Sequence, residues 1–305
     1  MPDATPATPA LSKGRVFARR LVSTVLLWAV VLGAVFSQQT LLANGLFLLV
    51  MLALTGFGLL EFYGLVERRG LPCFKEWGVF GGLILITSTF AYLSGLLGVQ
   101  EAPAKANDFA TSIVIFFVLG LCLRQLFHPT NTNGLIAVAT TLFGLMYVPW
   151  LLNFIQNIYY FPRIDECGPY YVLYFILVTK MSDTGAYVVG SLIGRHKMIP
   201  RVSPGKTWEG FAGALLFSLG GSLAFAVWAG DRLPGMTPVH ALILGLLLGA
   251  AAVLGDLIES LFKREAGCKD SGNLFPGIGG ILDLLDSLLF NAPLMYLYLR
   301  HILTH

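Results

Sequence analysis

Long apolar stretches recur along this chain, and each is long enough to cross a membrane. A helix needs about 20 mainly apolar residues to span the hydrocarbon core of a bilayer. Nine windows meet this criterion: Leu21–Ser37, Gly45–Val66, Trp77–Gly98, Phe109–Phe127, Leu135–Phe154, Tyr170–Ile193, Phe211–Ala229, Val239–Leu257 and Ile281–Ile302. The sequence therefore predicts an all-α integral membrane protein, a polytopic bundle of about nine transmembrane helices.

The composition agrees and excludes several other classes of protein. Of the 305 residues, 56% are hydrophobic and only 12% are charged, whereas a soluble domain carries about 25% charged residues. The net charge of +3 is too small for an electrostatic footprint on a polyanion, so we expect no nucleic-acid partner. The four cysteines lie far apart and indicate neither a zinc site nor a disulfide framework.

Hydropathy divides the chain into three parts. Residues 1–20 are rich in Pro, Ala and Thr and are predicted to be a flexible cytoplasmic segment. Residues 21–169 hold the first five spans, and residues 170–305 hold the last four spans with their polar loops. Basic residues precede Leu21, as in a signal peptide, but the apolar run is long and Phe36-Ser37-Gln38 is no cleavage site. We therefore expect a retained first span.

The basic residues predict the orientation, because cytoplasmic loops carry an excess of Lys and Arg. Five basic clusters fall on one side of the nine-span arrangement, namely the N-terminal segment and the loops after the second, fourth, sixth and eighth spans. This places the N-terminus inside and the C-terminus outside. The short hydrophilic loops and the lack of eukaryotic targeting signals favour a bacterial inner membrane.

The acidic residues concentrate in the second half of the chain. Nine of the 17 lie from Asp183 onward, and all of these but Asp231 map to the cytoplasmic ends of the last four spans or to the loops between them. In the first half, Glu61 is the one charge inside a span. Ionisable residues within a membrane are expensive and mark functional sites.

Three of these acids, Asp256, Asp283 and Asp286, form the strongest candidate metal site. Asp256, Glu259 and Lys263 recur at helical spacing, so they share one face. Asp283 and Asp286, three residues apart at the start of the last span, also point the same way. Converging carboxylates suit a hard divalent cation that keeps room for substrate phosphates. The alternative is that these acids cap the helix and offset its dipole.

A second polar stretch begins inside the sixth span. Its cations are Arg195, Lys197, Arg201 and Lys206, which suit phosphate groups, although positive-inside topology alone also explains such a loop. Lys180 and Asp183 could neutralise each other within the bilayer. Glu209 could be an N-terminal helix charge that follows Thr207. A turn-rich segment, residues 273–280, offers backbone amides that could approach an anion closely.

These motifs together resemble a known family. The segments concerned are Ser182-Asp183-Thr184-Gly185-Ala186-Tyr187, Ser203-Pro204-Gly205-Lys206-Thr207-Trp208-Glu209-Gly210, Ser260-Leu261-Phe262-Lys263-Arg264, Lys269-Asp270-Ser271-Gly272 and Asp283-Leu284-Leu285-Asp286-Ser287. They are similar to the signature of phosphatidate cytidylyltransferases, the membrane CDP-diacylglycerol synthases, and so is Glu61-Phe62-Tyr63. The resemblance is strong from about Lys180 to Ser287. It implies CTP and phosphatidic acid as substrates and Mg²⁺ as cofactor, with a second monovalent or divalent cation as a further option.

The resemblance also implies roles for individual residues. Asp256, Asp283 and Asp286 would be metal ligands, on the same helical spacing as above. The catalytic set would be Lys263, Arg264, Lys269, Asp270 and Asp183, with the cations neutralising the triphosphate or the lipid phosphate. The substrate-binding set would be Ser182, Lys206, Glu209, Ser260, Gly279 and Gly280. Glycine-rich helix faces and the family are compatible with a homodimer.

Two positions depart from the family pattern. Ile278 and Leu284 stand where the family usually has His and Arg, so we assign no catalytic role to a side chain at either position. The carboxylates and the cations Lys263, Arg264 and Lys269 are intact, which favours an active enzyme.

Four other classes of protein are alternatives to a phosphatidate cytidylyltransferase. A secondary transporter would show repeated halves, but the charge lies in one half. A CDP-alcohol phosphotransferase would need an Asp-Gly-x-x-Ala-Arg motif, and a polyprenyl transferase a second Asp-rich motif; the sequence has neither. A related CTP-dependent kinase or cytidylyltransferase acting on another lipid, such as dolichol, stays open.

Overall fold

The computed structural model describes residues 33, 40–98, 103–127, 133–162, 164, 167–272 and 280–304. Within them the protein is helical, in the order α2 (Thr40–Arg68), α3 (Lys75–Leu93), α4 (Pro103–Leu126), α5 (Gly134–Leu145), η1 (Met146–Trp150), α6 (Leu151–Tyr159), α7 (Gly168–Ile193), α8 (Trp208–Ala229), η3 (Gly230–Arg232), α9 (Pro238–Glu265), α10 (Ile281–Tyr298) and η4 (Leu299–Leu303). The predicted first span, Leu21–Ser37, lies outside the described residues.

Eight helical stretches in the described part of the chain are long and apolar enough to cross a membrane. Each overlaps one of the predicted windows after the first, which confirms the prediction of an all-α polytopic membrane protein. One span, Gly134–Tyr159, comprises α5, η1 and α6. The π-helical turn η1 contains Pro149. Proline has no amide hydrogen to donate, so the local widening of the helix has a clear cause.

Helix starts in the second half follow local sequence rules. Thr207 caps α8, where its hydroxyl accepts a hydrogen bond from the Gly210 amide, and Thr237 caps α9 in the same way. Pro238 occupies the first turn of α9, where a missing amide hydrogen costs nothing. The loop between α7 and α8 is a compact hairpin, closed by an isolated antiparallel bridge between Lys197 and Thr207.

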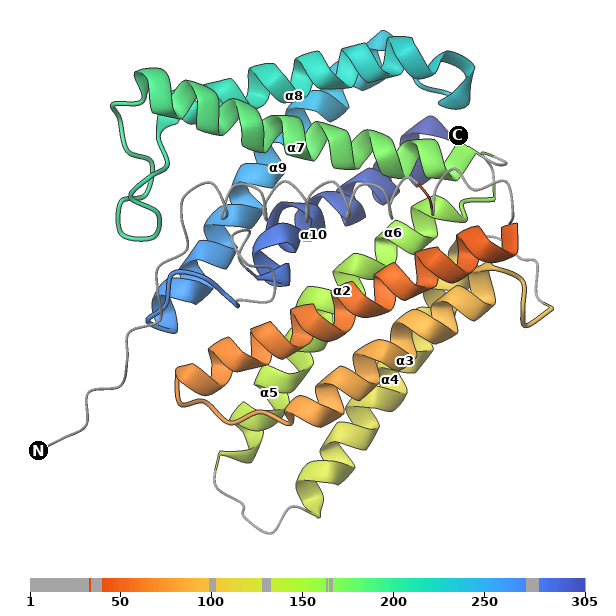
Figure 1. Ribbon diagram of the computed structural model, residues 1–305. Helices are drawn as coiled ribbons and strands as arrows, with labels where there is room; N and C mark the ends of the chain where they lie inside the picture. Colours follow the sequence, from red (N-terminus) through yellow and green to blue (C-terminus); the bar gives the residue numbers. More distant parts are fainter. Residues whose placement is uncertain are drawn as a thin grey trace, which may run out of the picture.

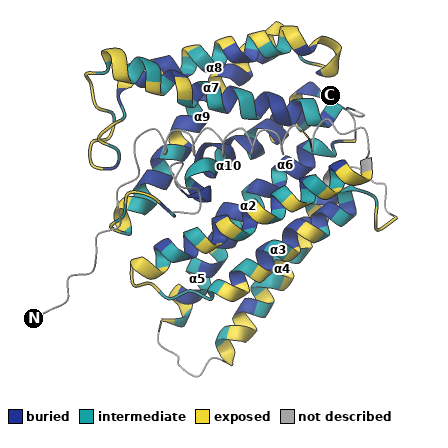
Figure 2. Ribbon diagram, in the orientation of Figure 1, coloured by how far each residue is buried: buried dark blue, intermediate teal, exposed yellow. Residues whose placement is uncertain are grey.

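The last four long helices pack as one layered group (Figure 1). The α7 and α8 helices lie side by side, α9 crosses beneath them, and α10 lies between α9 and the first helices. Gly185 of α7 and Gly213 of α8 permit this close approach, because a Cβ at Gly185 would overlap the Gly213 carbonyl. Most of α10 is coloured as buried or intermediate in Figure 2. In the span formed by α10 and η4, 67% of the apolar window is buried, against 17% in the span of α4.

The helices α2–α6 form the other half, and aromatic side chains fill its junction with α9. Phe262 of α9 contacts the rings of Phe62, Phe143 and Tyr147. Next to this group the buried Tyr63 hydroxyl donates to the Thr141 carbonyl (2.8 Å). The aromatic contact therefore ties α2–α6, which we call the scaffold half, to the end of α9 where the acidic residues lie.

Glycines spaced four residues apart lie where neighbouring helices of the same chain pack closely. A Cβ at Gly78 or Gly82 of α3 would overlap Tyr63 or Leu59 of α2, and Gly249 of α9 packs on Ser218 of α8. These glycines are therefore used for contacts between neighbouring helices, and a homodimer stays a prediction.

Candidate active site

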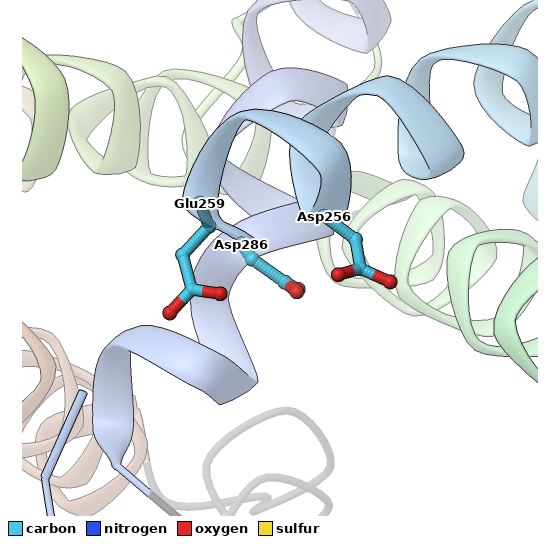
Figure 3. Close-up of side chains that lie close together, drawn as sticks. All are labelled: Asp256, Glu259 and Asp286. Atoms are coloured by element: carbon cyan, nitrogen blue, oxygen red, sulfur yellow. The ribbon is translucent and has the colours of Figure 1, made fainter. Parts of the chain in front are cut away.

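Three carboxylates from two helices converge at the centre of the site. Asp256 and Glu259 lie one turn apart on α9, and Asp286 approaches them from α10 (Figure 3). One oxygen from each lies within 4.8 Å of the others. Glu259 is fully buried and Asp286 is 7% exposed. We call these three residues the carboxylate centre.

The ammonium of Lys263 lies between two acids beside this centre. It forms ion pairs with Glu259, one turn earlier on α9, and with Asp283 of α10 (2.6 Å). Apart from this ammonium, neither oxygen of Glu259 has a hydrogen-bond partner among the described residues. Asp283 also accepts hydrogen bonds from the amides of Gly280 (2.7 Å) and Ser271 (3.3 Å).

Asp256 faces the loop between α7 and α8. Its Oδ2 atom lies 2.9 Å from the Nζ atom of Lys206, and its Oδ1 atom accepts from the Ser260 hydroxyl (3.3 Å). The Lys206 ammonium also donates to the carbonyl of Val253 (3.2 Å). The loop cation nearest the start of α8 is thus fixed against α9, at the edge of the carboxylate centre.

Asp183 connects α7 to the same centre through Ser287 of α10. The Ser287 hydroxyl donates to Asp286 (2.9 Å) and lies 3.3 Å from Asp183 Oδ1. Lys180, one turn away on α7, pairs with Asp183 (3.1 Å) and donates to the Leu284 carbonyl (3.4 Å). The mutual neutralisation of Lys180 and Asp183 therefore exists, and it lies beside the carboxylate centre rather than apart from it.

The charges of this network do not cancel. When all groups are ionised, five carboxylates (Asp183, Asp256, Glu259, Asp283 and Asp286) face three ammonium groups (Lys180, Lys206 and Lys263). The surplus is two negative charges in a largely buried region. Like charges held this close repel strongly unless a cation separates them.

A cavity of about 450 Å³ opens next to Asp256. Asp183 and Tyr187 of α7, Lys206 of the loop, Phe211 of α8 and Asp256 of α9 are among its lining residues. It therefore combines one ammonium, two carboxylates and aromatic surface, and its walls come from three helices and the loop. A pocket of this size can accommodate part of a nucleotide or a lipid headgroup.

The structure places other predicted residues further from the centre. Ser182 is buried and donates to the Gly249 carbonyl (3.1 Å), so its hydroxyl joins α7 to α9. Arg264 donates to the carbonyls of Val202 and Cys268. Lys269 and Asp270 are exposed, with no ion pair to any described residue. Gly279 and Ile278 lie outside the described residues.

Glu209 organises the loop between α7 and α8 rather than the carboxylate centre. Its carboxylate accepts hydrogen bonds from the amides of Arg195 (3.1 Å) and His196 (3.2 Å) and lies 2.6 Å from His196 Nδ1. It lines a shallow surface hollow with Arg195, Lys197 and Trp208. The alternative reading of Glu209 as a charge in the first turn of a helix agrees with its position in α8.

Sequence reasoning did not select Glu259 as a ligand, although its three-residue spacing from Asp256 was visible. It also passed over Tyr147, whose buried hydroxyl has no hydrogen-bond partner among the described residues. The π-helical turn that carries Tyr147 has one sequence signal, the proline at position 149 within an apolar run. Such turns are frequent at functional sites.

Comparison with known proteins identifies the class to which this fold and site belong. Residues 19–302, nearly the whole chain, match the model of the cytidylyltransferase family. The chain therefore belongs to the cytidylyltransferase family and is a nucleotidyltransferase, which confirms the predicted resemblance.

Individual relatives agree with this assignment. The phosphatidate cytidylyltransferase of Bacillus subtilis (strain 168) is 31% identical over 272 residues, which cover 86% of this chain and 97% of that protein. The phosphatidate cytidylyltransferase of Staphylococcus haemolyticus (strain JCSC1435) is 35% identical over 71% of this chain and 80% of its own length. The uncharacterized protein YnbB of Escherichia coli (strain K12) is 38% identical over 53% of this chain and 51% of its own length.

Proposed function

We propose that this protein transfers CMP from CTP to phosphatidic acid, giving CDP-diacylglycerol and pyrophosphate. The observation that carries the proposal is the alignment with a phosphatidate cytidylyltransferase over 97% of that relative's length. The cavity beside the carboxylate centre supports it, because Lys206 can neutralise phosphate while Tyr187 and Phe211 offer apolar contact. Lys263 and Arg264 are neighbours on α9, and we propose that they neutralise the negative charge of the other substrate phosphates.

We further propose that Mg²⁺ is the cofactor. The residues present fit a hard cation. The carboxylate centre offers oxygen atoms only, its Glu259 oxygens have no donor among the described residues other than the Lys263 ammonium, and the network carries two surplus negative charges when all its groups are ionised. Asp256, Glu259 and Asp286 would hold the ion. Asp283 pairs with Lys263 and remains a predicted ligand. When bound, Mg²⁺ would neutralise charge on phosphoryl oxygens.

In the proposed reaction a phosphate oxygen of phosphatidic acid attacks the α-phosphorus of CTP. A new P–O bond forms there, the bond between the α-phosphorus and the bridging oxygen to the β-phosphorus breaks, and pyrophosphate leaves with that electron pair. The attacking phosphate is already ionised at neutral pH, so the protein needs no general base. Phosphoryl transfer of this kind relies on positioning and charge neutralisation, which the lysines of the network can supply.

We propose that the site faces the cytoplasm of a bacterial inner membrane. The cavity includes the loop between α7 and α8, which carries four of the basic residues between positions 195 and 206. Cytoplasmic loops carry such an excess. A site at this face would receive CTP from the cytosol and phosphatidic acid from the inner leaflet.

The test is pyrophosphate release by the purified protein in detergent, with CTP and phosphatidic acid each present or omitted, and with Mg²⁺ present or chelated. We expect release only when both substrates and the metal are present. Asp256→Asn should abolish it, whereas Asp231→Asn, which changes an exposed acid in η3, should not. Release with dolichyl phosphate but not with phosphatidic acid would reject the proposed substrate in favour of another lipid phosphate.

A further inference from the structure

Glu61 is an acid of the scaffold half, and its hydrogen bonds to described residues all go to the half that contains α7–α10, which we call the catalytic half. It lies within the first described span, on α2. Its carboxylate accepts hydrogen bonds from the Ser271 hydroxyl (3.0 Å) and from the amides of Ile281 (3.0 Å) and Leu282 (2.8 Å). No Lys or Arg among the described residues pairs with it. The charge of Glu61 is therefore stabilised by donors more than 200 residues away in the sequence.

These contacts replace an ordinary helix cap. The first amides of an α-helix have no partner within the helix, and the residue at the N-cap of α10 is Gly280, which has no side chain to supply one. Glu61 accepts from the next two amides, and its negative charge is favourable at this end of the helix dipole. Asp283 takes the Gly280 amide. Two carboxylates, one from each half of the protein, thus fix the start of α10.

The surrounding residues leave space for this carboxylate. A Cβ at Gly272 or at Gly280 would overlap the Glu61 carboxylate. One turn earlier on α2, Gly58 lies next to α10, where an added Cβ would be in van der Waals contact with the side chains of Ile281 and Leu285. The α2 helix therefore contacts α10 along its first turns, and Glu61 is the polar part of that contact.

We propose that Glu61 is a positioning residue for the carboxylate centre. The α10 helix carries Asp283 in its first turn and Asp286 in its second, so a rotation or displacement of its start moves both carboxylates relative to α9. Glu61 acts through the α10 backbone and touches neither substrate nor the centre itself. The expected effect on catalysis rests on the proposed function. The claim that Glu61 fixes the start of α10, which we call the clamp, does not depend on it.

The clamp is tested by hydrogen exchange of the full-length protein in detergent. In Glu61→Ala, the amides at the start of α10 should exchange faster than in the wild type, and Glu61→Gln, which keeps an acceptor oxygen, should be intermediate. Glu67→Ala is the matched control, because it removes an exposed acid of the same helix whose bonds go to Lys75. Unchanged exchange in Glu61→Ala would overturn the clamp.

The positioning role is tested by direct metal binding, with Mn²⁺ as probe and electron paramagnetic resonance to count the free ion. Loss of groups that orient metal ligands weakens binding or activity by roughly 10- to 100-fold, so we expect a shift of this order for Glu61→Ala in both Mn²⁺ affinity and kcat. Ser271→Ala, which removes one of the three donors, should give a smaller shift and covers the case in which Glu61→Ala does not fold.

The outcomes separate the two proposals. Faster exchange at α10 with unchanged Mn²⁺ affinity and unchanged kcat would overturn the positioning role. A wild-type protein that binds no Mn²⁺ and releases no pyrophosphate would refute the proposed function, while the exchange measurement would still decide whether Glu61 holds α10.

Discussion

The two halves of the protein stabilise their membrane-embedded polar groups by different means. In α7–α10 the polar groups inside the spans include charged pairs, such as Lys180 with Asp183 and Lys263 with Asp283. Among the described residues of α2–α6 the fully buried polar groups are neutral: for example, the Tyr63 hydroxyl donates to a carbonyl, and Gln156 donates to Asn153. The ion pair of Lys75 with Glu67 lies at the ends of its helices and is partly exposed.

This difference indicates what each half does. A buried ion pair is a weak stabiliser, because desolvation offsets most of the attraction between the charges. Neutral hydrogen bonds join helices in a membrane at lower cost. Under the proposed function, α7–α10 keep charges inside their spans for the reaction, and α2–α6 act as the scaffold. Glu61 is the exception that joins them, since it belongs to the scaffold and bonds to the catalytic half.

The largest expected effect on stability is that of Lys263→Met. The variant leaves Glu259, which is fully buried, and Asp283 without their shared cation. Removing one partner of a buried ion pair typically costs about 3–5 kcal/mol, so we expect a loss of this order in denaturant unfolding in detergent. Lys75→Met, which breaks the exposed pair of the scaffold half, should cost about 0–1 kcal/mol. Equal losses would contradict the distinction between the halves.

Asp286→Asn should separate activity from stability. The substitution removes one charge from a network with surplus negative charge, so the unfolding free energy should stay the same or rise. Activity should fall by roughly 100-fold or more, the scale on which loss of one electrostatic contact to a reacting group is felt. Pyrophosphate release and thermal unfolding, measured on one preparation, check both parts.

The matched change in the scaffold half is Asp108→Asn, which alters an exposed acid of α4. This substitution should change neither the activity nor the unfolding free energy. If Asp286→Asn kept more than half of the wild-type activity, the carboxylate centre would not be the chemical site.

A smaller effect is expected in the scaffold, from Tyr63→Phe. The variant loses one buried hydrogen bond to the Thr141 carbonyl and keeps the ring in place. Such bonds contribute about 0.6–1 kcal/mol in membrane and soluble proteins. The free energy of unfolding should fall by that amount, while kcat and the KM for CTP stay at wild-type values. A change in kcat with unaltered stability would show that this part of the scaffold takes part in the chemistry.

Hydropathy alone predicted the helices of both halves, because a bilayer permits few other spanning structures. Eight of the nine predicted windows overlap the eight described spans, and their ends differ by at most eight residues. The convergence of Asp256 and Asp286 was also predictable, since each belongs to a helical row of acids near the end of its span. Proximity of the α9 and α10 ends brings these rows together.

The choice between Glu259 and Asp283 was not predictable from the sequence. It depends on how α9 and α10 are rotated about their axes, and both residues lie one turn from an acid of the centre. Lys263 occupies the position between them and pairs with both. The link between Lys206 and Asp256 depends on the path of a loop, and the cap of α10 by Glu61 joins residues 220 positions apart. Neither of these two contacts can be predicted from local periodicity in the sequence.

The smallest effect concerns Cys73, in the turn between α2 and α3 of the scaffold half. Burial raises the pKa of the Cys73 thiol, the nearby Glu67 carboxylate raises it further, and Lys75 opposes the shift. A raised pKa keeps the thiol protonated to higher pH, and the thiolate is the reactive form. In a variant whose only cysteine is Cys73, maleimide labelling at neutral pH should therefore be slower than that of a free thiol.

Glu67→Gln should speed this labelling, because it removes the negative charge and leaves Lys75 without its ion-pair partner. Glu76→Gln is the control, since that acid does not contribute to the thiol's shift. Neither variant should change pyrophosphate release. Charges at the edge of the scaffold half would then shift the pKa of the Cys73 thiol without affecting the reaction. A loss of activity in Glu67→Gln would instead mean that a charge of the scaffold half other than Glu61 contributes to activity.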